Sequence, residues 1–290
     1  MQAVELYASQ SILGEGPIWH AAKKTCYWVD IEQGILYGYN WLTQQTSTWQ
    51  FDYKLTMVIE CTGDHLLLAL DTSLARFTPE TGRLVWLVDI EPGITAHRCN
   101  DGASDSKGRL WAGTMHRQHQ HEAGSLYCID EHLTVTKKVA KVSISNGLAW
   151  SLNNKRLYYI DSPTQKVQCY LFEEETADII FEKTAIHIPV ELGGPDGMTI
   201  DAEGMLWVAH WGGFGVYRWN PLTGELLTKV EVPAPHVTSC AFAGEHLDYL
   251  LITTARENMT EEALTAYPQS GNTFIVQPGV PGVEAYKCVL

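Results

Sequence analysis

A chain of 290 residues that is 45% hydrophobic and 19% charged has enough apolar material for a continuous core, and its composition excludes a disordered protein. A net charge of -14 without any basic patch disfavours binding to nucleic acid or to an anionic membrane. No run approaches the roughly 18 apolar residues of a membrane span, and the N-terminus lacks a secretory signal, so we expect a cytoplasmic protein.

The seven cysteines are widely spaced and include no Cys-x-x-Cys pair. An odd number without close pairs is typical of neither a disulfide framework nor a zinc cluster. We therefore expect buried free thiols.

A degenerate repeat runs along the chain. Each copy starts with a polar residue and a glycine, and continues through short aromatic and β-branched runs separated by Asn, Asp and Gly turns. Such a pattern indicates strands, because helical periodicity is almost absent. In chain order, the copies begin at Glu15, near residue 56, at Asn100, at Asn146, at Pro195 and near residue 238.

Six such copies in a chain of this length predict an all-β fold, a six-bladed β-propeller with four short strands in each blade. A pair of β-sandwiches is the alternative architecture, but it would not need six similar repeats. Since no Pro/Ser-rich linker or change in composition interrupts the chain, we expect a single domain over residues 1–290.

Four of the copies carry a polar residue at the same point, directly before a Gly or an Asp-Gly: Glu15, Asn100, Asn146 and Asp196. Taken singly, each is an ordinary turn residue. Because the first strand of every propeller blade lines the central channel, their recurrence predicts that these side chains converge there.

Two carboxylates among oxygen donors suit one divalent cation in the central channel. Ca²⁺, Mg²⁺, Mn²⁺ and Fe²⁺ match such ligands, and Zn²⁺ matches them less naturally because neither His nor Cys belongs to the set. Three protein ligands would leave coordination positions open for water and substrate, as catalysis requires.

Five ordered motifs make the chain, from about residue 10 to 285, resemble the regucalcin and gluconolactonase family, also called the senescence marker protein and luciferin-regenerating enzyme family. The motifs are Leu13-Gly14-Glu15-Gly16-Pro17, Arg98-Cys99-Asn100-Asp101-Gly102, Ala112-Gly113-Thr114-Met115, Ile144-Ser145-Asn146-Gly147-Leu148 and Pro195-Asp196-Gly197. Three further stretches are most similar to bacterial sugar lactonases of the xylonolactonase type: residues 211–215, 232–238 and 253–256.

The resemblance implies a role for each channel residue. Glu15, Asn146 and Asp196 would bind the metal, and Asp196 would also be the catalytic base. Arg98 and Asn100 would hold the sugar hydroxyls.

The segment from His116 to Glu122 contains three histidines. We expect a polar loop at the mouth of the channel, with His116 or His119 in contact with substrate, and a second metal site is the alternative interpretation. Regucalcins have a substrate-contacting Glu three residues after the Gly-Thr-Met motif, whereas this chain has Gln118 there.

The resemblance implies metal-dependent hydrolysis of a small-molecule sugar lactone, such as glucono-, xylono-, arabinono- or galactonolactone, to the aldonic acid. A non-catalytic calcium-binding regulatory protein is the alternative, and a protein-docking propeller is a third, which would not need carboxylates in the channel. Whether Asp196 or the cation alone activates the water stays open. No Gly-x-Ser-x-Gly elbow supports a serine hydrolase. We expect a monomer or a weak homo-oligomer.

Overall fold

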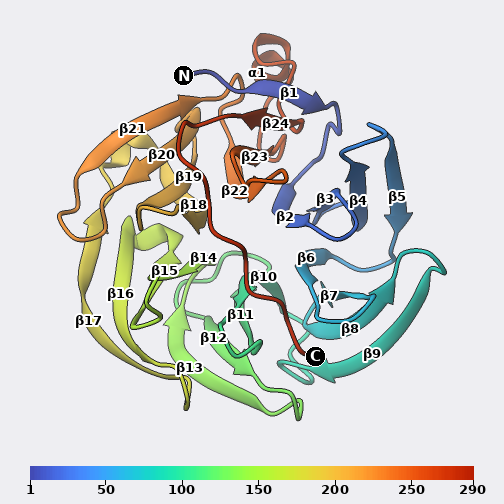
Figure 1. Ribbon diagram of the computed structural model, residues 1–290, viewed down its shortest axis with the longest axis vertical. Helices are drawn as coiled ribbons and strands as arrows, with labels where there is room; N and C mark the ends of the chain where they lie inside the picture. Colours follow the sequence, from blue (N-terminus) through green and yellow to red (C-terminus); the bar gives the residue numbers. More distant parts are fainter.

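The computed structural model describes residues 1–290 and shows six four-stranded antiparallel sheets arranged radially around one axis (Figure 1). The prediction of an all-β, six-bladed propeller is confirmed, including blades at the two weakest repeats. We number the blades I to VI in chain order and call the space between their innermost strands the central channel.

Blade I consists of β2 (Gly14–His20), β3 (Thr25–Asp30), β4 (Ile35–Asn40) and β5 (Thr46–Gln50). Blade II consists of β6 (Leu55–Glu60), β7 (Leu66–Leu70), β8 (Ser73–Thr78) and β9 (Arg83–Asp89). Blade III consists of β10 (His97–Ser104), β11 (Leu110–His116), β12 (Gly124–Ile129) and β13 (Val135–Val142). Blade IV consists of β14 (Ser145–Trp150), β15 (Arg156–Asp161), β16 (Lys166–Glu173) and β17 (Asp178–His187). Blade V consists of β18 (Gly194–Ile200), β19 (Leu206–Trp211), β20 (Gly215–Trp219) and β21 (Leu226–Glu231).

Blade VI is built from both ends of the chain. Its inner strands are β22 (Val237–Ala243), β23 (Tyr249–Thr254) and β24 (Thr273–Val276), and its outermost strand is β1 (Val4–Tyr7), which pairs antiparallel with β24. This pairing closes the ring, because the N-terminal strand completes the blade that the C-terminal segment forms.

Helical structure is confined to connections. These are the one α-helix α1 (Glu261–Ala266) and the 3-10 turns η1 (Ser162–Thr164) and η2 (Val190–Leu192). None of them is long and apolar enough to cross a membrane.

The hydrophobic core lies between neighbouring blades, where inner strands such as β3, β7 and β14 are buried along their whole length. Polar side chains of the turns form hydrogen bonds with side chains of this core. The indoles of Trp111 and Trp207 donate hydrogen bonds of 2.9 Å to Asp105 and Asp201, one in each of blades III and V. This shared bond explains why the repeat keeps an Asp turn before a strand that begins with Leu-Trp.

All six innermost strands have a register shift where they pair with the second strand of their blade. Such a β-bulge adds unpaired residues on one strand and redirects their side chains. The four polar residues singled out above lie at or beside these bulges, which is how side chains of a regular sheet come to face the axis.

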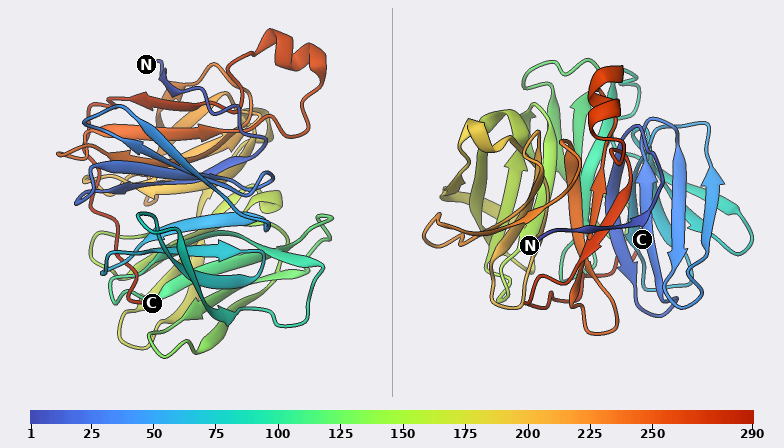
Figure 2. Two further views of the ribbon diagram at one scale, coloured as in Figure 1. Left: turned by 90° about the vertical axis from the view of Figure 1, so that its right-hand side faces the viewer. Right: turned by 90° about the horizontal axis from the view of Figure 1, so that it is seen from above.

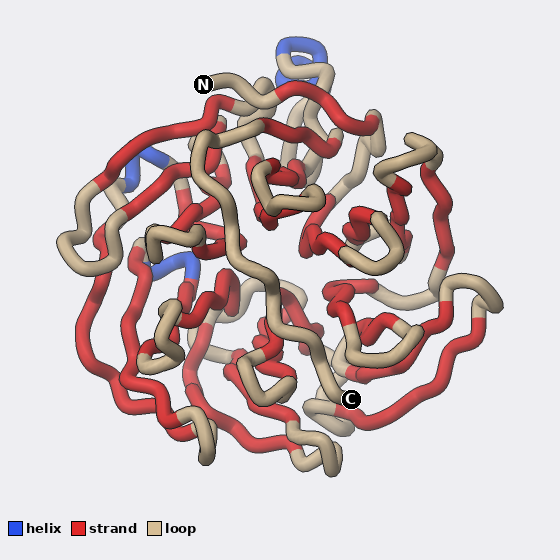
Figure 3. Tube along the Cα trace, in the orientation of Figure 1, coloured by secondary structure: helices blue, strands red, loops and turns tan.

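The segment after β24, residues 277–290, is called the C-terminal tail here. It lacks regular secondary structure and runs across one face of the propeller from blade VI toward blade II (Figure 3). Helix α1 projects from the opposite face (Figure 2). The two ends of the channel are therefore covered by different segments of the chain.

Candidate functional site

A cavity of about 340 Å³ opens at the N-terminal ends of the innermost strands, on the face that carries α1. We call it the channel cavity. Five of the six residues proposed from the sequence line it: Glu15, Arg98, Asn100, Asn146 and Asp196. They come from β2, β10, β14 and β18, so blades I, III, IV and V each contribute.

Asn100 connects two blades. Its Nδ2 donates to the Ser145 carbonyl at 2.8 Å and to Asn146 Oδ1 at 3.2 Å. Arg98 Nη1 donates to Asn100 Oδ1 and, at 3.0 Å, to the Cys99 carbonyl. Because these side chains are buried and hydrogen-bonded, their positions relative to one another are held firmly.

Asn146 is oriented from both sides. Its Nδ2 donates to Ser162 Oγ at 2.8 Å, which leaves Oδ1 on the side of Asn100. The chain before it is held by Asp161, whose carboxylate accepts a hydrogen bond from the Ile144 amide at 2.9 Å.

Asp30 has the same function in blade I. Its two carboxylate oxygens accept hydrogen bonds from the backbone amides of Ile12 at 2.8 Å and Leu13 at 3.2 Å, just before Glu15. The last residue of the second strand thus positions the entry to the innermost strand in both blades.

The glycines of the motifs are needed because the inner strands approach one another closely. A Cβ on Gly147 would lie 2.8 Å from the Asp196 carbonyl oxygen, and one on Gly197 would overlap Ser239 Oγ. Both contacts are shorter than van der Waals packing allows, so a larger residue would push the site strands apart.

Glu15 and Asp196 are both 7% exposed and carry strongly perturbed carboxyl groups. Burial, followed by repulsion from Asp101, raises the pKa of Glu15 to about 8, although the Gly16 amide and Arg98 lower it in part. Burial, followed by repulsion from Glu15 and Asp101, raises the pKa of Asp196 well above its usual value. The negative charge gathered here is not balanced by Arg98.

A divalent cation fits this arrangement, because it would offset the repulsion that raises both pKa values. The donor set consists of two carboxylates and the Asn146 amide oxygen, all of them hard ligands. No group of three or more His, Cys, Asp and Glu side chains is placed to hold a metal ion. The fit therefore depends on the amide as the third donor.

Sequence reasoning missed Asp101. Its carboxylate repels those of Glu15 and Asp196, and its own pKa is raised to about 6 by burial, which the Gly102 amide at 2.7 Å offsets in part. The signal was present in the sequence, since Asp101 directly precedes a glycine as do Glu15 and Asp196. The repeat alignment instead placed Asn100 at this position.

His116 is not among the side chains that line the channel cavity. It ends β11, its ring packs edge-on against His97 with centroids 5.5 Å apart, and its Nδ1 accepts a hydrogen bond from the Gln118 amide at 3.1 Å. The turn that follows instead brings His119 to the cavity, which Glu257 and Asn258 from the loop before α1 also line. No sequence pattern marked Glu257, and Asn258 stood out only as the start of the Asn258-Met259-Thr260 sequon, which says nothing about a channel site.

The fold and the motifs are shared with known proteins. A family model described as the SMP-30/Gluconolactonase/LRE-like region matches residues 13–256. The chain is 34% identical over 280 residues to regucalcin of Macaca fascicularis, covering 94% of each chain. It is 33% identical over 284 residues to a Bacillus subtilis protein provisionally named as a sugar lactone lactonase, covering 98% of this chain and 97% of the other.

Solved structures agree with these matches. The calcium-binding protein regucalcin from Agrobacterium tumefaciens superposes with a TM-score of 0.95 at 29% identity, covering 100% of this chain and 98% of the other. A luciferin-regenerating enzyme superposes with a TM-score of 0.91 at 30% identity, covering 97% of each chain. On both the sequence match and the shared fold, the chain belongs to the SMP-30/gluconolactonase/LRE-like family.

Proposed function

We propose that this protein hydrolyses a sugar lactone to the corresponding aldonic acid, with one divalent cation bound by Glu15, Asn146 and Asp196. The observation that carries the proposal is the pair of buried, unbalanced carboxylates at the end of the channel, beside an arginine and an asparagine in the same cavity. The name of the matching family and that of the Bacillus subtilis relative both refer to lactone hydrolysis.

Lactone hydrolysis requires a polarised carbonyl, a water nucleophile and stabilisation of the oxyanion that forms. When bound, the cation would polarise the carbonyl and lower the pKa of a water in the cavity. The remaining requirements fall on the side chains of the protein.

Asp196 is the candidate proton acceptor. In the metal-free protein, burial and repulsion from Glu15 and Asp101 raise its pKa well above the ordinary value, and a bound cation would lower it again and favour the ionised form that accepts a proton. Since the residue is almost fully buried and its strand is held by close packing at Gly197, the carboxylate stays where a water in the cavity can reach it.

Arg98 and Asn100 are the candidate groups for holding the sugar hydroxyls. A guanidinium has five donors in a fixed plane, and only Nη1 is used within the protein. The bonds between Arg98, Asn100 and Asn146 place this donor next to the proposed cation ligands. We assign the additional contact at the mouth of the cavity to His119, because His116 lies outside it.

A lactone-dependent acidification assay tests the proposal. Chelator-treated protein is incubated with a panel of pentono- and hexonolactones, with and without each of Ca²⁺, Mg²⁺, Mn²⁺, Fe²⁺ and Zn²⁺. We expect metal-dependent rates above spontaneous hydrolysis for at least one lactone. Rates at the spontaneous level with every metal would refute the proposal.

The alternative function is calcium binding without catalysis. It is favoured by the similarity to a regucalcin described as a calcium-binding protein. Tight binding of Ca²⁺ together with spontaneous-level rates in the same assay would support this function in place of lactone hydrolysis.

A further inference from the structure

A second cavity, of about 270 Å³, lies at the other end of the channel, between the innermost strands and the C-terminal tail. We call it the tail cavity. No residue lines both cavities. The tail cavity is formed by the C-terminal ends of the innermost strands, and the tail segment 283–286 covers it.

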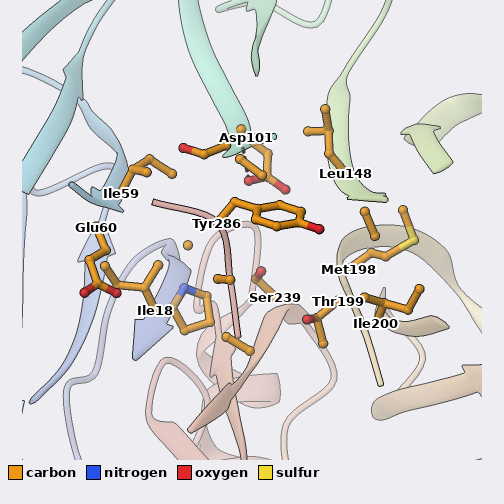
Figure 4. A pocket seen from close by; sticks show the side chains of 18 of the residues that line it. Ile18, Ile59, Glu60, Asp101, Leu148, Met198, Thr199, Ile200, Ser239 and Tyr286 are labelled. Carbon is orange, nitrogen blue, oxygen red and sulfur yellow. Dashed lines mark hydrogen bonds between the residues drawn. The ribbon is translucent and has the colours of Figure 1, made fainter. Parts of the chain in front are cut away.

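The walls of the tail cavity are mainly apolar, with 17 hydrophobic residues among the 27 that line it. All six innermost strands contribute side chains to the lining, and Figure 4 shows Ile18, Ile59, Leu148 and Met198 among those around the ring of Tyr286. Apolar walls of this kind favour the burial of a hydrophobic body.

The charged side chains that line the tail cavity are all acidic. Its lining includes three carboxylates, Glu60, Asp101 and Glu284, and no Lys, Arg or His. Glu60 is neutralised by Lys287 at 2.9 Å, and the side chain of Glu284 is 70% exposed. Asp101 accepts a hydrogen bond from the Gly102 amide at 2.7 Å and forms no ion pair, so a partly exposed carboxylate faces the cavity without a cationic partner.

Hydrogen bonds hold the C-terminal tail in place over the tail cavity. Hydrogen bonds join the tail to five of the six blades: Gly282 N to Leu247 O at 2.8 Å, Ala202 N to Pro281 O at 3.0 Å, Tyr286 Oη to Asn154 Oδ1 at 2.8 Å, Val289 N to Gly108 O at 3.0 Å and Cys288 N to Glu60 O at 2.8 Å. The tail thereby crosses this end of the channel and holds the Tyr286 ring over the cavity that Asp101 also lines (Figure 4).

We propose that the tail cavity is a second binding site, for a small organic amine with one protonated nitrogen and a single-ring or short aliphatic body. The ammonium group would pair with Asp101, the body would contact the apolar walls, and the face of Tyr286 would add a cation–π contact. The volume lies slightly below the roughly 300 to 1,000 Å³ of sites for drug-sized ligands, which limits the ligand to about one ring. This proposal does not depend on lactone hydrolysis.

Calorimetry on the full-length protein with three matched probes tests the proposal. 2-Phenylethylamine, 2-phenylethanol and phenylacetate share a ring and differ in charge. We expect saturable binding of the amine with a Kd of about 1 mM or below, weaker binding of the alcohol, and none of the carboxylate. Equal binding of all three, or no binding of the amine, would overturn the proposal without the need for any variant.

Two variants locate the amine. Asp101→Asn should weaken binding of the amine by at least about tenfold and leave binding of the alcohol unchanged, because it removes the partner charge. Glu284→Gln is the matched control, since it removes one exposed charge at the rim, and it should change the affinity by less than about twofold.

The channel cavity is the competing location for an amine, because it is also acidic. Binding in the tail cavity should persist in saturating Ca²⁺ and in Asp196→Asn. Loss of amine binding when Ca²⁺ is added, or equal effects of Asp101→Asn and Glu284→Gln, would show that the amine does not occupy the tail cavity.

Discussion

Asp196→Asn is the substitution that most directly tests the proposed chemistry. Asparagine keeps the size of the side chain and one oxygen that can bind a cation, but it cannot accept a proton. The site is tightly packed, with Asp196 7% exposed and Gly197 against Ser239, so an isosteric change should leave the strand in place. General base catalysis is worth about 10² to 10⁴ in rate, or about 2.7 to 5.4 kcal/mol in activation free energy.

We therefore expect turnover by Asp196→Asn to fall by at least about a hundredfold when the metal is saturating. Glu15→Gln is the matched control, because it removes the same charge from the same cavity and retains the proposed base. Turnover is measured at a metal concentration that calorimetry shows to fill the site of each variant. The thermal midpoint of each variant checks that it is folded.

Near-wild-type turnover in Asp196→Asn would refute its role as the base, and activation of water by the cation alone would then be preferred. An equal loss in Glu15→Gln would show that the charge of the ligand set, and not proton transfer to Asp196, limits the rate.

Titration of chelator-treated protein should show one tight divalent site per chain, and two equivalent tight sites or none would contradict the proposed ligand set. Asn146→Ala should weaken metal binding, whereas Asn100→Ala should weaken binding of the lactone and leave metal affinity within about a few fold. Equal effects of the two substitutions on metal affinity would refute this division of roles. The test is demanding because the two side chains are hydrogen-bonded to each other. In the folded metal-free protein the pKa of Glu15 is about 8, above the ordinary 4.5, so the folded state favours the protonated carboxyl. The protonated carboxyl therefore adds to the free energy of unfolding at low pH, and this contribution is lost as pH rises toward 8. Stabilisation by added Ca²⁺, measured as the rise in thermal midpoint, should accordingly grow from about pH 5 to pH 8, and a constant rise would contradict the raised pKa. All seven cysteines are free and buried, so a thiol reagent should label them slowly in the native protein and completely after denaturation; rapid labelling of the native protein would contradict this burial.

Much of the fold follows from local sequence. Short β-branched and aromatic runs, separated by Asn, Asp and Gly turns, depend on backbone preferences that act within a few residues. Repetition then determines the number of blades, because every copy must bury the same two sheet faces against its neighbours. For this reason the repeat pattern by itself assigns Glu15, Asn100, Asn146 and Asp196 to equivalent points of their blades.

The tertiary structure alone decided which side chains meet, because these contacts join residues far apart in the chain. Asp101 and Asn100 adjoin different cavities although they are neighbours in sequence, since a β-bulge redirects successive side chains. The loop before α1 brings Glu257 to the channel cavity, and the turn after β11 brings His119 there in place of His116. Pairing of β1 with β24 and the path of the C-terminal tail across five blades likewise depend on packing between distant segments, for which no local pattern in the sequence exists.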